Sequence, residues 1–224
     1  MIVLRLIVQT GLWLLAMALV LLLAAGNPAW AAAWAFLIEI GALGGAVGLW
    51  LAWRDPGLLA ERLNWRAQAA QAPWDRRFMI AIVLGFVIWL ALMGLDAERW
   101  RLSLVPPFLQ GVGVLAIGFS VWMGWRVFMV NPFAAPVVKT QPGQSVIATG
   151  PYAVVRHPLY AGAVAFFIGA PLMLGSWLGL AAAPFLIAAM GARAVGEERL
   201  LHAQLPGYDA YAEKVRYRFV PRLW

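Results

Sequence analysis

The sequence predicts an all-α integral membrane protein, built as a bundle of five or six transmembrane helices that includes a C-terminal helical hairpin. Apolar residues make up 63% of the 224 residues and charged residues only 12%, a mixture too apolar to cover the surface of a soluble domain. Four segments also reach the ~20 apolar residues that a helix needs to cross a hydrocarbon core of ~30 Å. Cysteine is absent, which excludes structural disulfides, thiolate zinc sites and a cysteine nucleophile.

The predicted transmembrane segments follow one another along the chain. The four long ones are residues 4–25, 30–53, 78–95 and 104–128. The first exceeds the apolar core of a signal peptide, so we interpret it as a retained span. Two shorter apolar stretches, 159–175 and 177–193, meet at Gly175-Ser176-Trp177. They predict either two spans joined by a tight turn or a re-entrant-like hairpin.

Positive charge predicts the orientation of these segments. Of the 17 basic residues, all but Arg99 and Arg101 fall on one side of the predicted membrane. The positive-inside rule therefore places both termini in the cytoplasm, together with an interfacial loop at 54–77. In that loop Leu58, Leu59 and Leu63 share one helical face, as in a helix lying at a membrane surface. The net charge of +7 is explained by these loops, and no basic stripe with interleaved aromatics indicates a nucleic-acid partner.

Polar residues divide the chain into two functional parts. Residues 1–130 are N-terminal transmembrane helices with the interfacial loop, whereas 131–224 contain a Pro- and Gly-rich loop, the hairpin and a charged tail. Glu39 is an exception, because it lies in the middle of the second span, where an ionisable group is costly unless paired or solvated. It is either a substrate or proton site, or a structural glutamate that is protonated or bonded to its helix.

Two motifs in the second part carry candidate chemistry. His157 lies at the start of an apolar helix beside Arg156 and Tyr160, where free N–H groups favour anionic ligands. Arg193 and Glu197 are four residues apart and project from one helical face. They form either an ordinary ion pair of small energy or a carboxylate and a guanidinium offered to a charged ligand.

Together these motifs resemble the isoprenylcysteine carboxyl methyltransferase family and, more broadly, the membrane methyltransferases that include phospholipid N-methyltransferases. The resemblance covers about residues 131–221 and rests on Gly150-Pro151-Tyr152, on Arg156-His157-Pro158-Leu159-Tyr160-Ala161-Gly162, and on Glu197-Glu198 followed by Leu205-Pro206-Gly207-Tyr208. The first half, including Pro73-Trp74-Asp75, is similar to the bacterial branch of the family. This resemblance implies a multi-pass protein of the bacterial inner membrane with a cytoplasmic cofactor-binding loop and a tail helix.

The resemblance also implies a binding site for S-adenosylmethionine on the cytoplasmic side. The cofactor-binding residues would be Gln141, Gln144, Ser145, Val146, Ile147, Tyr152, His157, Pro158, Leu159, Tyr160 and Glu197. Glu197 would hold the ammonium group, and the helix start at His157 would donate to the carboxylate. Glu198 faces about 100° away, so we expect it to tolerate substitution better than Glu197.

The acceptor is the less defined partner. The resemblance implies that Arg193 binds a substrate carboxylate, and Glu39 is a second candidate substrate-binding residue because of its place within the second span. Arg193, Tyr160 and His157 are the candidate catalytic residues. The expected acceptor is a lipophilic or amphiphilic molecule among the membrane lipids, methylated on oxygen, nitrogen or sulfur. No metal is expected, because the donor carries its own leaving group. The alternatives are an NAD(P)H-dependent membrane reductase of sterol-reductase-like architecture, which carries a related motif, and a non-enzymatic membrane protein.

Overall fold

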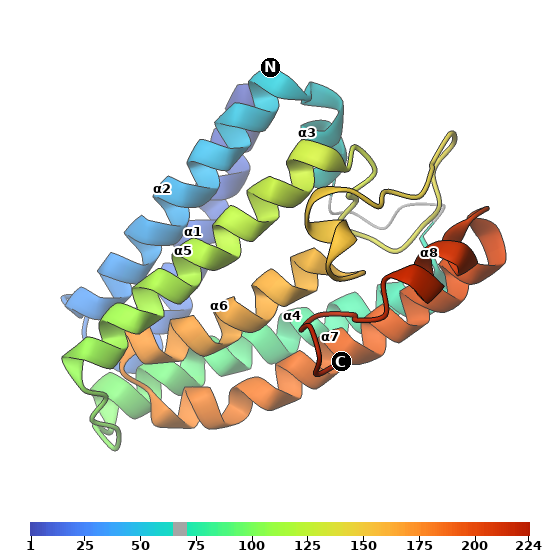
Figure 1. The fold of residues 1–224 in the computed structure, drawn as a ribbon. Coiled ribbons are helices and arrows are strands. Elements are labelled where there is room, and N and C mark those ends of the chain that lie inside the picture. The colour runs from blue at the N-terminus through green and yellow to red at the C-terminus, as the bar shows by residue number, and fades with distance from the viewer. Residues whose placement is uncertain (65–70) are drawn as a thin grey trace.

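The computed structural model describes residues 1–64 and 71–224 and confirms the all-α fold class (Figure 1). The α-helices of the described residues are α1 (Ile2–Ala25), α2 (Ala31–Arg54), α3 (Pro56–Arg62), α4 (Pro73–Gly94), α5 (Pro107–Val130), α6 (Pro158–Leu174), α7 (Trp177–Gln204) and α8 (Tyr208–Lys214). A π-helical turn, η1 (Leu95–Arg99), continues α4, and a 3₁₀ turn, η2 (Gly150–Ala153), precedes α6.

Five of the described helices are long and apolar enough to cross a membrane: α1, α2, α4 with η1, α5 and α7. They confirm a multi-pass membrane protein and overlap the four long predicted spans and the second predicted arm of the hairpin, with shifted ends. α4 begins at Pro73 rather than 78, because a proline fits the first helical turn and Asp75 follows it there. α5 begins at Pro107 rather than 104 for the same reason. α6 has only 17 residues.

The C-terminal hairpin forms where the sequence predicts it. Gly175 ends α6 in the left-handed conformation with φ 80°, which glycine adopts at little cost. Ser176 then caps α7 by accepting a hydrogen bond from the Gly179 N–H at 2.8 Å. A Cβ on Gly175 would lie 3.9 Å from Ala97, so α6 ends where α4 ends and α7 returns along the bundle. α7 continues to Gln204, well beyond the predicted end at 193.

The helices α5 and α6 approach each other through glycines. A Cβ on Gly169 would lie 2.8 Å from the Gly113 carbonyl oxygen and 2.9 Å from the Ala116 Cβ. Membrane helices gain packing energy from such close backbone contact, since lipid tails provide no hydrophobic drive for association.

We therefore predict that Gly169→Ala destabilises the bundle by about 1–3 kcal/mol, because the added methyl meets backbone that cannot move aside. A lower thermal midpoint in detergent would show this effect. Gly111→Ala is the matched control on α5, since a Cβ there has no neighbour within 4 Å. Equal midpoints for both variants would refute the prediction.

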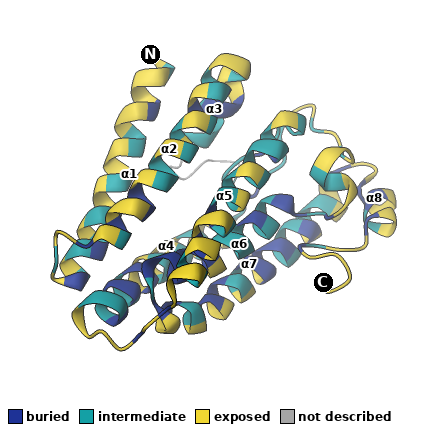
Figure 2. Cartoon of the chain, turned by 60° about the vertical axis from the view of Figure 1, so that its left-hand side comes forward, coloured by how far each residue is buried: buried dark blue, intermediate teal, exposed yellow. Residues whose placement is uncertain are grey.

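One apolar cluster joins the two predicted parts of the chain. Leu21 and Trp89 from the first part pack in one cluster with Phe167 and Phe219 from the second. The division at residue 130 is therefore a hypothesis about function and does not mark two independent cores. Exposed apolar residues cover the outer faces of the long helices (Figure 2), as lipid contact requires.

The interfacial loop differs from the prediction in what its leucines contact. Asp55 caps α3 by accepting from the Leu58 N–H at 2.9 Å. Leu58 and Leu59 are buried and belong to one apolar cluster with Leu51 and Val127, so they pack on the end of the bundle rather than facing lipid. Residues 65–70, which include part of this loop, lie outside the described residues.

Candidate active site

A cavity of about 400 Å³ lies at the end of the bundle where α6 begins and α7 ends. Its walls come from α6, α7, the long loop after α5, η2, α8 and the end of α3. The predicted site residues that line it are Gln144, Ser145, Val146, Ile147, Tyr152, His157, Pro158, Leu159, Tyr160, Arg193 and Glu197. The volume falls in the range of small-molecule sites.

Two predicted residues lie away from this cavity. Gln141 donates from its side chain to the Phe133 carbonyl at 2.9 Å and from its backbone N–H to Gln144 Oε1 at 2.9 Å. It therefore braces the loop and is not one of the cavity-lining residues. Glu39 lies on α2 facing Gly118 of α5, and its buried Oε2 has no hydrogen-bond partner among the described residues. The structure does not bring Glu39 to the other site residues.

The start of α6 is fixed by proline and by the tail. Pro158 occupies the first turn and disfavours helical backbone at His157, which has φ −123° and ψ 67°. The backbone N–H groups of Arg156 and His157 donate to the Tyr217 and Arg218 carbonyls, both at 2.9 Å. The His157 N–H group, one of the donors expected for the cofactor carboxylate at the helix start His157–Tyr160, is therefore already used by the tail.

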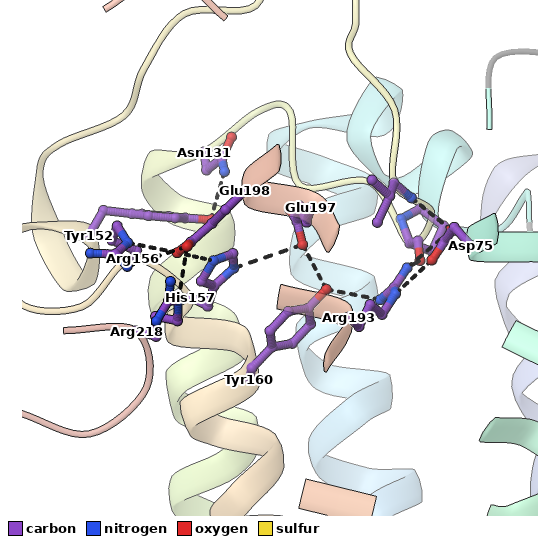
Figure 3. A network of polar contacts seen from close by, with 12 residues as sticks. Asp75, Asn131, Tyr152, Arg156, His157, Tyr160, Arg193, Glu197, Glu198 and Arg218 are labelled. Carbon is purple, nitrogen blue, oxygen red and sulfur yellow. Dashed lines mark hydrogen bonds and ion pairs between the residues drawn. The ribbon is translucent and has the colours of Figure 1, made fainter. Parts of the chain in front are cut away.

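Glu198 is the centre of a buried ionic cluster that anchors this tail (Figure 3). Its carboxylate accepts from Arg156 Nε at 2.7 Å and from Arg218 Nε at 2.9 Å, and lies 3.0 Å from His157 Nε2. The residue is only 4% exposed. The expectation that Glu198 tolerates substitution well conflicts with this placement, since the 100° offset from Glu197 directs it into the cluster.

A second chain of contacts joins Asp75 to Glu197 (Figure 3). Arg193 donates from Nε to Asp75 Oδ1 at 2.8 Å and from Nη1 to the Tyr160 hydroxyl at 3.1 Å. Tyr160 in turn donates to Glu197 Oε2 at 2.8 Å. Arg193 is thus paired with a carboxylate and held in place, rather than left free for a substrate anion.

Asp75 is a site residue that sequence reasoning missed. Its side chain is fully buried and also accepts from the Val138 N–H at 3.0 Å and from Gln71 Nε2 at 2.8 Å. It therefore ties α4, α7 and the loop after α5 together. The available signal was a carboxylate in the first turn of a mainly apolar helix.

Glu197 keeps one oxygen available to the cavity. Its side chain is 29% exposed, and no described residue donates to Oε1. The rings of His157 and Tyr160 stack beside it with centroids 5.3 Å apart and planes within 4° of parallel, and Phe219 packs edge-on against both. The cavity thus presents a carboxylate next to two parallel aromatic rings.

Tyr152 supplies a hydroxyl on another part of the wall. Burial raises the pKa of Tyr152 to about 12, so the phenol stays protonated at neutral pH. Its oxygen accepts from Asn131 Nδ2 at 2.7 Å, and its backbone carbonyl accepts from the Tyr211 hydroxyl at 2.8 Å. Arg62 of α3 also lines the cavity, although sequence analysis did not single it out.

The fold and cavity define a multi-pass membrane protein with a charged, ligand-sized site at one end of its bundle. Residues 109–205 match the family model described as phospholipid methyltransferase, which confirms the resemblance to the membrane methyltransferases. This part of the chain is therefore similar to a membrane methyltransferase domain. No curated protein matches the chain. The matched range contains all of α6 and α7, whereas Asp75 and Arg62 lie outside it.

Proposed function

We propose that the protein transfers a methyl group from S-adenosylmethionine to a lipophilic or amphiphilic acceptor at the cytoplasmic face of the membrane. The observation that carries this proposal is the Glu197 carboxylate. One of its oxygens is fixed by Tyr160 at 2.8 Å and the other has no donor among the described residues. The methyltransferase family match implies a methyl donor, and the cavity chemistry favours this one.

The residues present fit S-adenosylmethionine, which supplies an activated methyl on a sulfonium with a thioether as leaving group. Glu197 would accept hydrogen bonds from its ammonium. The parallel rings of His157 and Tyr160 would lie against the cationic sulfonium. Gln144–Ile147 line the cavity without helical structure, which leaves their backbone groups for contacts with the adenosine.

The chain's own contribution is positioning and exclusion of water. Tyr160 is held from two sides, by Arg193 and Glu197, so its ring and hydroxyl are fixed before a ligand binds. Holding acceptor and donor in line at short distance removes much of the entropic barrier to transfer. We assign Arg193, Tyr160 and His157 to this positioning of the reacting groups.

A titration tests the proposed cofactor. We expect S-adenosylhomocysteine to raise the melting temperature of the purified protein, and Glu197→Gln to weaken its binding by about 1.5–3 kcal/mol, the value of a charge-assisted hydrogen bond. Isothermal calorimetry measures the second effect. Glu213→Gln, on the exposed side of α8, is the control. Unchanged affinity in Glu197→Gln would remove this residue from the site, and stabilisation by NADPH instead would favour a reductase.

We further propose that the cavity faces the cytoplasm of a bacterial cell, with both termini on that side. Arg5 donates to the Leu63 carbonyl at 2.8 Å, so the N-terminus lies at the α3 end of the bundle, near the cavity. Most basic residues lie towards this end, which the positive-inside rule places in the cytoplasm.

Cysteine labelling tests this orientation, because the native chain has no cysteine. We expect a membrane-impermeant maleimide to label Arg101→Cys in intact cells and to leave Glu213→Cys unlabelled until the cells are opened. Both positions are exposed, so accessibility within the protein does not limit either reaction. Labelling of Glu213→Cys from outside would reverse the orientation and separate the site from the cytoplasmic cofactor pool.

A further inference from the structure

Arg62 contributes a guanidinium to the cavity wall from the end of α3. Its Nη1 donates to the Ala134 carbonyl at 3.0 Å, and its Cζ lies 4.4 Å from the centre of the Phe128 ring. Burial lowers the pKa of Arg62 to about 10, so the group remains cationic at neutral pH. Arg62 is half-buried, and a partly desolvated cation is costly unless an anion compensates it.

The other cations on the cavity wall already have such partners. Arg193 pairs with Asp75 at 2.8 Å, Arg156 with Glu198 at 2.7 Å, and Lys139 with Glu61 at 2.7 Å. No carboxylate of a described residue lies within ion-pair distance of Arg62. Residues 65–70 contain neither Asp nor Glu, so they supply none either. Arg62 is therefore a cation whose partner has to come from a ligand.

Tyr152 provides a second donor on the same part of the wall. Tyr152 and Phe128 pack against one apolar cluster, and Arg62 lies over the Phe128 ring, so the two donors approach the cavity from neighbouring positions. The oxygen accepts from Asn131, and no described residue accepts the hydroxyl hydrogen. An N–H fork and an O–H donor that both line one cavity are the donor set of a carboxylate or phosphate site.

We propose that Arg62 and Tyr152 form an anion subsite of the cavity that binds a carboxylate or phosphate group. The inference rests on the proposed function and assigns anion binding to Arg62, because Arg193 is already neutralised by Asp75. Two sources offer this chemistry: the carboxylate of the cofactor's amino-acid moiety and the headgroup of an anionic lipid acceptor. Glu197 would take the cationic part of the ligand.

Paired ligands distinguish the two sources. The first pair is S-adenosylhomocysteine and its decarboxylated analogue, which keeps the ammonium. The second pair is phosphatidic acid and diacylglycerol with identical acyl chains, each in mixed micelles of a neutral detergent. Calorimetry on the full chain measures how strongly the anionic member of each pair is preferred.

We expect the wild type to prefer the anionic member of at least one pair and Arg62→Gln to reduce that preference about ten-fold, as loss of a charge-assisted contact predicts. The preference is a ratio within one variant, so partial loss of folded protein cancels. Arg54→Gln is the control, because Arg54 is exposed at the end of α2 and does not line the cavity. If Arg62→Gln cannot be purified, Arg62→Lys replaces it. Lysine keeps the charge but cannot donate two parallel N–H bonds, so we expect the preference for the anionic ligand to fall at least three-fold.

If the Arg62 variant loses the preference only for S-adenosylhomocysteine over its decarboxylated analogue, the cofactor carboxylate binds at Arg62. If it loses the preference only for phosphatidic acid over diacylglycerol, a lipid headgroup binds there. A wild type without preference in either pair, or an Arg62 variant that retains the full preference, overturns the subsite. If S-adenosylhomocysteine does not bind at all while phosphatidic acid is preferred through Arg62, the proposed function fails and the subsite stands.

Discussion

Glu198→Gln is expected to destabilise the protein by about 3–5 kcal/mol, the effect of breaking a buried ion pair from one side. The variant keeps the shape of the side chain but leaves Arg156 and Arg218 without the carboxylate that they share at 2.7 and 2.9 Å. Arg156 also donates to the Val215 and Arg216 carbonyls, so loss of the cluster would release the tail from the start of α6. Thermal unfolding in detergent measures the change.

A double-mutant cycle separates this cluster from general damage to α7. Because Arg156 and Glu198 act on each other, Arg156→Leu combined with Glu198→Leu should cost less than the sum of the two single changes. Glu197→Gln is the control at the neighbouring residue. It should leave the thermal unfolding midpoint almost unchanged while lowering the affinity for the cofactor. A midpoint of Glu198→Gln equal to that of the wild type would show that the cluster does not support the fold.

Most of the fold follows from local patterns, and this explains what the sequence could predict. The spans are set by runs of apolar residues, and their ends by proline and glycine, as at Pro107 and Gly175. The motif around His157 also lies within one short segment, so the start of α6 and its neighbours on the cavity wall could be identified from sequence. Each of these features depends on residues close together in the chain.

The long-range contacts of the site could not be predicted in the same way. Asp75 and Arg193 are 118 residues apart, and their pairing depends on how α4 packs against α7. Glu197 and Glu198 contact different partners, but the contact of Glu198 with Arg218 depends on how the tail folds back onto α7. Likewise, α3 has an apolar face of leucines that could contact either lipid or protein. That this face contacts protein is known only from its packing with Val127.

Asp75→Asn is expected to lower the affinity for S-adenosylhomocysteine about ten-fold or more, although Asp75 is not one of the cavity-lining residues. Without the carboxylate, Arg193 has an uncompensated charge and is separated from Glu197 only by the Tyr160 hydroxyl, at 3.1 and 2.8 Å. The guanidinium would then pair with Glu197, the carboxylate proposed for the cofactor ammonium. The ligand would lose its charge-assisted contact with Glu197, which corresponds to the expected loss of affinity. Calorimetric titration of the purified variant measures the loss.

A second substitution distinguishes this positioning role from simple destabilisation. If Arg193 is what blocks Glu197, then Asp75→Asn combined with Arg193→Met should bind S-adenosylhomocysteine more tightly than Asp75→Asn alone, since the competing cation is gone. A merely damaged fold would instead make the double variant as weak as the single one or weaker. Asp209→Asn, a change at a carboxylate that is 77% exposed, is the control for loss of charge. Normal affinity in Asp75→Asn, or no recovery in the double variant, would show that Asp75 does not keep Arg193 away from Glu197.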